Sequence, residues 1–218
     1  MRNKGSLLKE LPVLVVVALV VSLLIKTFLV QFFYIPSGSM ENTLQVKDRV
    51  AVNKVPFLSK NINRGDVVVF RDPGNWLPEI TDYTTNKYVA KAKSALVIVG
   101  VLPNPAKQYL VKRVIGVAGD HIVCCTKSGN LTINDVEVIE TYIFAGNKPS
   151  EMKFDVTVPK GKLWVMGDHR GASADSRYHQ DDINKGFVPL SRVTGRVVSV
   201  IWPFKNITYV PKVDVLKK

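Results

Sequence analysis

A serine that could act as a nucleophile lies in the segment IPSGSM, residues 35–40. Pro36 restricts the backbone and Gly38 frees it again, which is typical of a turn that presents a side chain. The side chain presented there is that of Ser39, which needs a base to take its proton. G-x-S-x-G is absent around it, and Asn42 stands where an S-x-x-K motif requires lysine. The base must come from elsewhere in the chain.

Two kinds of residue could supply that base. By composition His121, His169 and His179 are candidates, but only His169 lies in a motif-like run, GDHRGASADSR. Lys112 is the other candidate, because the strand-like stretch YLVKRVIGV could turn it toward an apolar pocket. Burial lowers a lysine pKa from about 10.4 by up to roughly 3–5 units, and a neutral amine can take a serine proton. On these residues alone, a lysine that reaches solvent from a strand edge is the simpler interpretation.

The elements that must position these residues are short strands bounded by Gly, Pro, Asn or Asp. They are expected at Asp66–Phe70, Tyr109–Val117, His121–Cys125, Leu131–Val138, Phe154–Val158, Leu163–Met166 and Gly195–Trp202. Asn134-Asp135 predicts a tight hairpin turn. The pattern predicts a mainly β fold with an antiparallel core, an insertion at about 73–108 and a small β subdomain at about 120–160. Within the insertion, Ser94–Leu102 could form a strand or a short helix.

The N-terminus carries a long apolar segment. Leu11–Ile25 is an uncharged run of fifteen residues with basic residues before it. Alone it would rise only about 22 Å as a helix, less than a hydrocarbon core of about 30 Å, but apolar residues continue beyond Lys26. We therefore expect one transmembrane helix over residues 11–33. Residues 1–10 would form a short cytoplasmic tail and 34–218 an extracytoplasmic catalytic domain.

Two other interpretations of this segment fit less well. A cleaved signal peptide needs a small-x-small site after its apolar core, and KTFLVQFFYIP offers none. A buried core helix would have a polar second face, and nothing in the run marks one. Basic residues on both sides leave the orientation undecided by the positive-inside rule. The expectation that the N-terminus lies inside therefore depends on function.

Composition excludes several other classes of protein. With 46% hydrophobic and 22% charged residues, most of the chain should fold around a core. The net charge of +12 is spread along the chain, which favours a basic face next to anionic lipid over a nucleic-acid-binding arm. No zinc-finger, KH or RNP pattern occurs. Cys124 and Cys125 are adjacent, so we expect no ordinary disulfide between them, and no metal-ligand spacing is present.

Four motifs follow the apolar segment in order. They are IPSGSM, RGDVVVF at Arg64–Phe70, KRVIGVAGD at Lys112–Asp120 and GDHRGASADSR at Gly167–Arg177. With them the chain strongly resembles the type I signal peptidase family. The resemblance implies an antiparallel β-sheet core of signal-peptidase type, a Ser-Lys dyad and no cofactor. It also implies cleavage of signal peptides from secreted preproteins outside the cytoplasmic membrane, in transient contact with the export translocon and without nucleic acid.

By position, the resemblance gives each motif residue a role. Ser39 would be the nucleophile and Lys112 the general base. Ser37 would add its hydroxyl to the oxyanion hole beside the Ser39 N–H, and Ser173 would orient the lysine amine. The supporting charges would be Asp168, Arg170, Asp175 and Arg177, the last two as a salt bridge, and Arg113 could join them. The pocket, selective for small residues at positions −1 and −3, would have as walls Ile35, Pro36, Met40, Leu44, Leu110, Val111 and Val165.

The sequence departs from the family's pattern at several positions, Asn42, Gly171 and Ala172 among them, and two rival functions are left to consider. Asn42 stands where members of the family often carry proline. A self-cleaving Ser-Lys protease like those of DNA-damage repressors would lack the apolar N-terminal segment. A catalytically inert, membrane-tethered envelope assembly factor would have no need of both Ser39 and Lys112 in these contexts.

Overall fold

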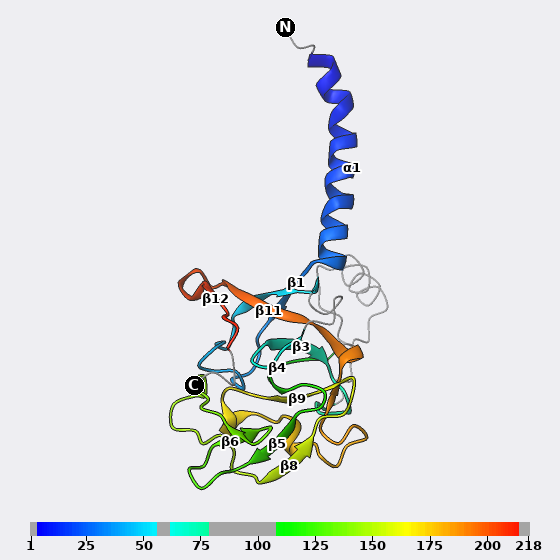
Figure 1. Cartoon of the computed structure of the whole chain (residues 1–218). Helices are drawn as coiled ribbons and strands as arrows, with labels where there is room; N and C mark the ends of the chain where they lie inside the picture. Colours follow the sequence, from blue (N-terminus) through cyan, green and yellow to red (C-terminus); the bar gives the residue numbers. More distant parts are fainter. Residues whose placement is uncertain (1–3, 56–61, 79–107, 214–218) are drawn as a thin grey trace.

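A computed structural model describes residues 4–55, 62–78 and 108–213 of the 218-residue chain. A long helix, α1, leads into a domain built from two β-sheets (Figure 1). The larger sheet has eight strands in the order β1-β2-β11-β3-β4-β9-β10, with β12 paired to β11. The smaller sheet has the order β7-β6-β5-β8. Every strand pairing among the described residues is antiparallel, which confirms the predicted mainly β, antiparallel architecture.

The elements have the following bounds. Helix α1 spans Lys4–Phe28. The larger sheet contains β1 Val30–Tyr34, β2 Arg49–Asn53, β3 Val67–Arg71, β4 Tyr109–Gly116, β9 Lys162–Met166, β10 Val188–Pro189, β11 Val193–Trp202 and β12 Thr208–Tyr209. The smaller sheet contains β5 His121–Cys124, β6 Leu131–Ile133, β7 Val136–Glu137 and β8 Phe154–Thr157. Short 3-10 turns lie at η1 Arg170–Ala172, η2 Ser176–Tyr178, η3 Leu190–Arg192 and η4 Phe204–Asn206.

Each of the seven predicted strand segments contains a strand. The predicted hairpin is present between β6 and β7, and its turn residues Asn134 and Asp135 have φ angles of 51° and 64°. Two consecutive positive φ angles are the hallmark of the type I′ turn, whose twist matches that of the flanking strands. The prediction missed β1, β2, β10 and β12. The expected insertion at 73–108, with Ser94–Leu102, lies mostly outside the described residues.

The N-terminal segment departs most from the prediction. Helix α1 ends at Phe28 and β1 begins at Val30, so the end of the predicted 11–33 span is a strand and that boundary was wrong. β1 pairs with β2 along its whole length, from Val30↔Asn53 to Tyr34↔Arg49. The β-branched and aromatic residues that seemed to prolong the helix suit this pairing. Across the described ranges, none of the helices combines the length and the apolar character that a membrane crossing demands.

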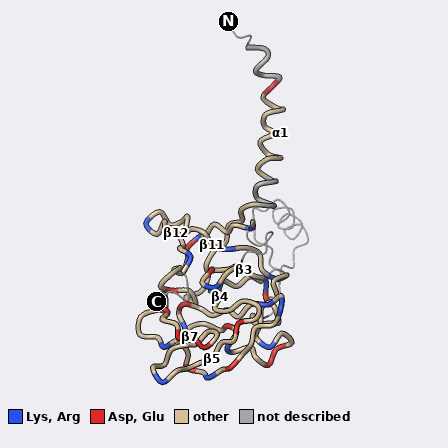
Figure 2. Tube along the Cα trace, viewed as in Figure 1, with Lys and Arg blue, Asp and Glu red and all other residues tan. Residues whose placement is uncertain are grey.

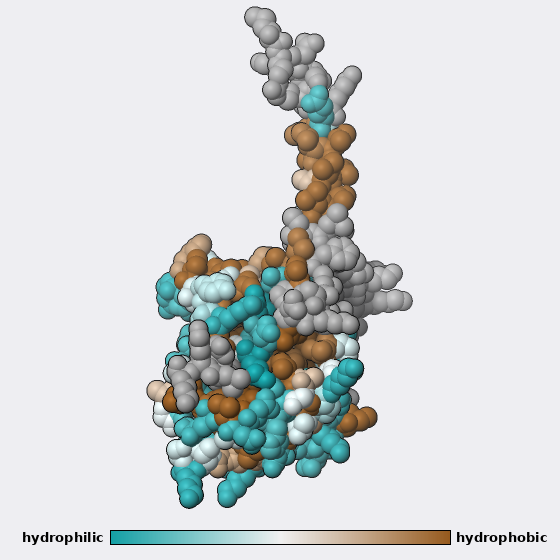
Figure 3. Space-filling view, in the orientation of Figure 1, coloured by the Kyte–Doolittle hydropathy of each residue, from teal (hydrophilic) through white to brown (hydrophobic). Residues whose placement is uncertain are grey.

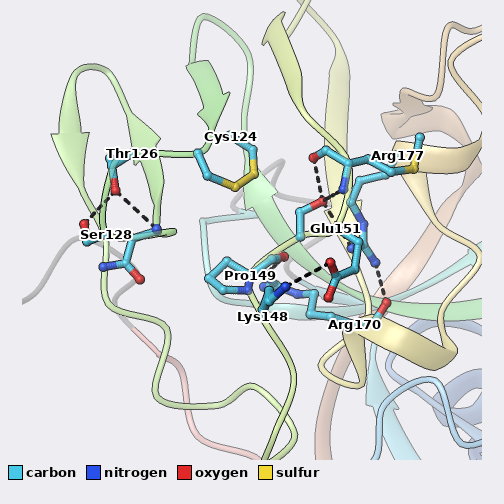
Figure 4. Close-up of a disulfide and its surroundings, with 12 residues drawn as sticks. Cys124, Thr126, Ser128, Lys148, Pro149, Glu151, Arg170 and Arg177 are labelled. Carbon is cyan, nitrogen blue, oxygen red and sulfur yellow. Dashed lines mark hydrogen bonds and ion pairs between the residues drawn. A yellow bond between two sulfur atoms is a disulfide. The ribbon is translucent and has the colours of Figure 1, made fainter.

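The cysteine pair also differs from expectation. Cys124 and Cys125 are joined to each other by a disulfide at the end of β5, although their adjacency in the sequence predicts no ordinary disulfide (Figure 4). The peptide bond between them is cis, which leaves their Cα atoms only 3.0 Å apart. The pair packs against the apolar cluster under the smaller sheet.

Strand β4 is the element that positions the site. It lies in the larger sheet between β3 and β9, with Lys112 opposite Val68 of β3 and Arg113 opposite Met166 of β9. Ser39 lies in the turn that follows β1, where Ile35 N–H donates to the Asp48 carbonyl and fixes the start of the loop. A strand in the middle of a sheet and a turn at its edge thus carry the two residues that the sequence singled out.

Candidate active site

The side chains of Ser39 and Lys112 meet, although 73 residues separate them. Lys112 Nζ donates a hydrogen bond to Ser39 Oγ at 2.7 Å. Both residues are buried, with 7% of Ser39 and 4% of Lys112 exposed. A hydroxyl within hydrogen-bond reach of an amine is the geometry that proton transfer from a serine requires.

The surroundings of Lys112 favour its neutral form. Leu110 and Val114, two residues away on either side, share its strand face and belong to one apolar cluster. Burial lowers the pKa of Lys112 from 10.5 to about 8, although the carboxylates of Asp175 and Asp168 act in the opposite direction. A charged amine loses its hydration in such a place, and that loss outweighs the attraction of the carboxylates. The apolar surroundings expected from the sequence are therefore present.

This lowered pKa predicts a pH dependence of the reaction. Only the neutral amine can take a proton, so we expect kcat/KM to rise with pH through about 8 and then to level off. The measurement is kcat/KM for a fluorogenic peptide across this range, with the thermal midpoint of the protein recorded at each pH. An acidic limb centred on the ordinary lysine value of 10.5 would contradict the prediction.

The turn that carries Ser39 packs tightly against Gly167, which follows β9. A Cβ atom at Gly167 would lie 2.4 Å from the Ser39 carbonyl oxygen and 2.3 Å from Ser173 Oγ. His169 N–H donates to the same Ser39 carbonyl at 3.2 Å. Among the described residues the Ser39 N–H has no hydrogen-bond acceptor, and the exposed Ser37 hydroxyl makes no hydrogen bond either. Both donors are thus available for an anion.

A buried ion pair lies behind the lysine. Arg177 donates to both carboxylate oxygens of Asp175 at 2.8 Å, as the predicted salt bridge requires. Burial raises the pKa of Asp175, but hydrogen bonds from Arg177, the Gly167 N–H and Ser173 outweigh it and hold the pKa below its ordinary value. Ser173 Oγ donates to Asp175 at 2.7 Å, and no hydrogen bond joins it to Lys112 in the described part of the chain. The expected contact between Ser173 and the lysine amine is therefore replaced by one with a stronger acceptor, an ionised carboxylate.

Two further ion pairs lie in the domain, and Thr43 of the loop that carries Ser39 bonds to one of them. Arg113 binds Asp168 through two hydrogen bonds of 2.8 and 2.6 Å, and the Thr43 hydroxyl donates to the same carboxylate at 2.5 Å. Arg170 likewise binds Glu140 through two hydrogen bonds, of 2.9 and 2.5 Å. All four charged residues are almost fully buried, so each needs its partner.

The sequence motifs did not indicate several residues that contact the ion pairs or His169. They are Glu41, Thr43, Glu140, Tyr142 and Phe144. The Arg113 guanidinium lies over the ring of Tyr142, 4.2 Å from its centre. The last three missed residues come from the irregular segment between β7 and β8, where no periodicity signals a role. Glu41 and Thr43 did carry a signal, since they follow Ser39 by two and four residues.

The residues expected to line the substrate pocket divide between two apolar clusters. Ile35, Met40 and Leu44 belong to one cluster, and half-buried Val111 packs against it. Leu110 and Val165 belong to the cluster beside Lys112. This division follows from the alternation of side chains along β4, which sends neighbouring residues to opposite faces. Pro36 is exposed.

Comparison with known proteins assigns the chain to the peptidases. The model of the family described as "Signal peptidase, peptidase S26" matches residues 8–202. The "Probable signal peptidase I" of Mycobacterium leprae is 37% identical over 92% of this chain and 78% of its own length. Signal peptidase I of Mycobacterium tuberculosis is 36% identical over 92% of this chain and 74% of its own length. The "Probable signal peptidase I-2" of Synechocystis is 32% identical over 95% of this chain and 76% of its own length. The chain belongs to the signal peptidase family, peptidase S26.

Proposed function

We propose that this chain is a type I signal peptidase, an endopeptidase that removes N-terminal signal peptides from exported preproteins. In this proposal Ser39 is the nucleophile and Lys112 the general base. The observation that carries it is the 2.7 Å hydrogen bond between a buried lysine of lowered pKa and a serine hydroxyl. A catalytically inert assembly factor would gain nothing from burying a lysine there, because burial of that amine is costly.

The reaction follows from the geometry. Neutral Lys112 takes the hydroxyl proton while Ser39 Oγ bonds to the carbonyl carbon of the scissile peptide. In this proposal the resulting oxyanion accepts hydrogen bonds from the Ser39 N–H and from the Ser37 hydroxyl. As the C–N bond breaks, the lysine ammonium returns the proton to the leaving amine, which becomes the N-terminus of the mature protein. Water then attacks the acyl-enzyme, with Lys112 again as base, and releases the signal peptide.

The apolar clusters beside the dyad fit a preference for small residues. Ile35, Met40 and Leu44 are rigidly packed side chains close in sequence to Ser39. Walls of this kind distinguish substrates by shape, since they exclude large side chains and offer no polar contacts. We therefore infer cleavage after small-x-small sequences.

The direct test uses the purified full chain and a preprotein with alanine at −1 and −3 from the cut. We expect one new N-terminus, identified by mass spectrometry, and no product with Ser39→Ala. Cleavage by the Ser39→Ala protein, or no cleavage by the folded wild-type protein, would refute the proposed function.

We further infer that α1 anchors the chain in the cytoplasmic membrane as a single span, with the N-terminus inside and the catalytic domain outside. In the part of α1 with described side chains, residues 10–22, Glu10 is the one charged residue (Figure 2). Leu14, Val16 and Leu19 there are more than half exposed, so the described part of the domain does not cover their apolar side chains (Figure 3). Export substrates emerge on the outer face, where transient contact with the translocon would deliver them.

Anionic lipid is the other partner in this proposal. A set of exposed apolar side chains, here called the aromatic rim, lies on β1, on β12 and around η4. It consists of Phe32, Tyr34, Trp202, Phe204, Ile207 and Tyr209. β1 follows α1 after one residue, so the rim lies at the end of the domain that carries the helix (Figures 1 and 3). Aromatic side chains suit the membrane interface, and the net charge of +12 suits anionic headgroups.

Tryptophan fluorescence can test this placement. Of the three tryptophans, Trp202 is 44% exposed, whereas Trp76 is 7% and Trp164 0% exposed. In proteoliposomes with brominated anionic lipid, we expect quenching that disappears in the Trp202→Phe variant. The absence of quenching in the wild-type protein would refute contact between the rim and lipid. Protease added outside spheroplasts should digest the domain if its orientation is as proposed.

A further inference from the structure

Three consecutive residues after Ser39-Met40 tie the nucleophile turn to the rest of the domain. Glu41 Oε2 lies 3.0 Å from His169 Nδ1, and the Asn42 amide donates to the Tyr142 carbonyl at 2.9 Å. The Thr43 hydroxyl bonds to a carboxylate of the ion pair described above. Asn42 has a φ of 88°, which proline cannot adopt because its ring fixes φ near −65°. The side chains of these three residues thus hold the turn.

Of these three residues, Glu41 is the one whose side chain lies over Gly38. A Cβ atom at Gly38 would be 2.9 Å from the carboxyl carbon of Glu41, so the carboxylate covers Gly38. The Glu41 N–H also donates to the Gly38 carbonyl at 3.0 Å and closes the turn. The peptide unit between Gly38 and Ser39 carries the N–H that the proposed function assigns to the oxyanion. Glu41 therefore borders that peptide unit on two sides.

His169 is fixed on two sides as well. Its backbone N–H donates to the Ser39 carbonyl, and its ring stacks on Phe144 at 4.1 Å with an angle of 16° between the planes. The Phe144 N–H in turn donates to the Asp168 carbonyl at 2.9 Å, so the stacking partner is itself held in place. His169 thereby binds the Ser39 carbonyl through its backbone N–H and the Glu41 carboxylate through its ring.

We propose that Glu41 and His169 are positioning residues that fix the Gly38–Ser39 peptide unit in the orientation required for the oxyanion. This inference rests on the proposed function. Within the described residues neither side chain makes a hydrogen bond to Ser39 Oγ or Lys112 Nζ, so we assign neither the role of acid or base. A donor that must meet the oxyanion stabilises the transition state and not the bound substrate. Loss of the pair therefore lowers kcat and leaves KM unchanged.

The test compares variants of the full chain on one preprotein. We expect Glu41→Ala and His169→Ala each to lower kcat about tenfold or more, with KM within about twofold of wild type. The double variant should be no slower than the slower single variant, because the two residues act as a unit. Glu41→Gln keeps an acceptor for the imidazole and should recover most of kcat. Equal thermal midpoints would show that all the variants fold.

A second histidine–carboxylate pair in the same chain provides the matched control. His121 Nε2 lies 2.7 Å from Asp155 Oδ1 on the smaller sheet, and both side chains are more exposed than those of Glu41 and His169. His121→Ala and Asp155→Ala should leave kcat unchanged. Wild-type kcat in Glu41→Ala, a rise in KM alone, additive losses, or Glu41→Gln as slow as Glu41→Ala would each overturn the inference. A wild-type protein without activity would instead refute the proposed function.

Discussion

Replacement of Lys112 by arginine is expected to abolish signal-peptide cleavage, with kcat reduced about 10⁴-fold or more. Arginine keeps the positive charge and the reach of lysine, but its guanidinium does not lose a proton in proteins. If Lys112 is the base, charge alone cannot replace it. The measurement is single-turnover cleavage of a preprotein by Lys112→Arg and by wild type.

Two further variants make that result interpretable. Lys112→Met places an apolar side chain in the same buried site, so it should fold and be equally inactive. Lys162 is a half-buried lysine on β9, and the Lys162→Arg variant should retain wild-type activity. A working Lys112→Arg enzyme would refute the general-base role and leave the family assignment intact.

A methyl group at Gly167 is expected to cost about 100-fold in kcat or more, because a shift of about 1 Å at a catalytic group has that effect. The added Cβ would lie within 2.5 Å of the Ser39 carbonyl oxygen and of Ser173, and one of those atoms is backbone. The turn that carries the nucleophile must therefore move away from β9. Kinetics of Gly167→Ala, together with its thermal midpoint, measure this effect.

Gly171 offers a control in the same motif. There an added Cβ would find its nearest neighbour, Asn147 Oδ1, at 3.6 Å, which is ordinary contact. Gly171→Ala should therefore remain active. Gly167→Ala with kcat within about threefold of wild type would show that the packing around Ser39 is looser than the structure indicates.

Much of the fold was predictable because its strands are short apolar or alternating segments bounded by turn residues. In β5 and β6 the buried positions alternate strictly, so their period of two stands out in the sequence. β1 was missed for the opposite reason. Its residues VQFFY belong to the apolar segment that resumes after Lys26, and such a segment does not separate the end of a helix from an edge strand. What makes this segment a strand is its pairing with β2, a contact between residues about 20 positions apart that the local sequence does not reveal.

The site was predictable where its residues lie in ordered motifs, and not where partners come from distant segments. Ser39 and Lys112 were singled out by motif, and the structure places them in contact. Ser173 was expected to bond the lysine, but Asp175, two residues away in the same motif, competes for its hydroxyl. Glu140 lies in an irregular segment whose sequence gives no sign that it pairs with Arg170.

The burial of Lys112 has a consequence for the stability of the protein. Because its pKa is about 8 in the folded state and near 10.5 when unfolded, the unfolded chain binds more protons between these values, and stability rises with pH there. Below pH 8 the amine is charged in both states, so burial of its charge lowers the free energy of unfolding by the full amount. At about 1.4 kcal/mol for each pH unit between the two values, that cost is about 3 kcal/mol. Lys112→Met would remove it along with activity, so selection for thermal stability alone would favour inactive enzymes at this position.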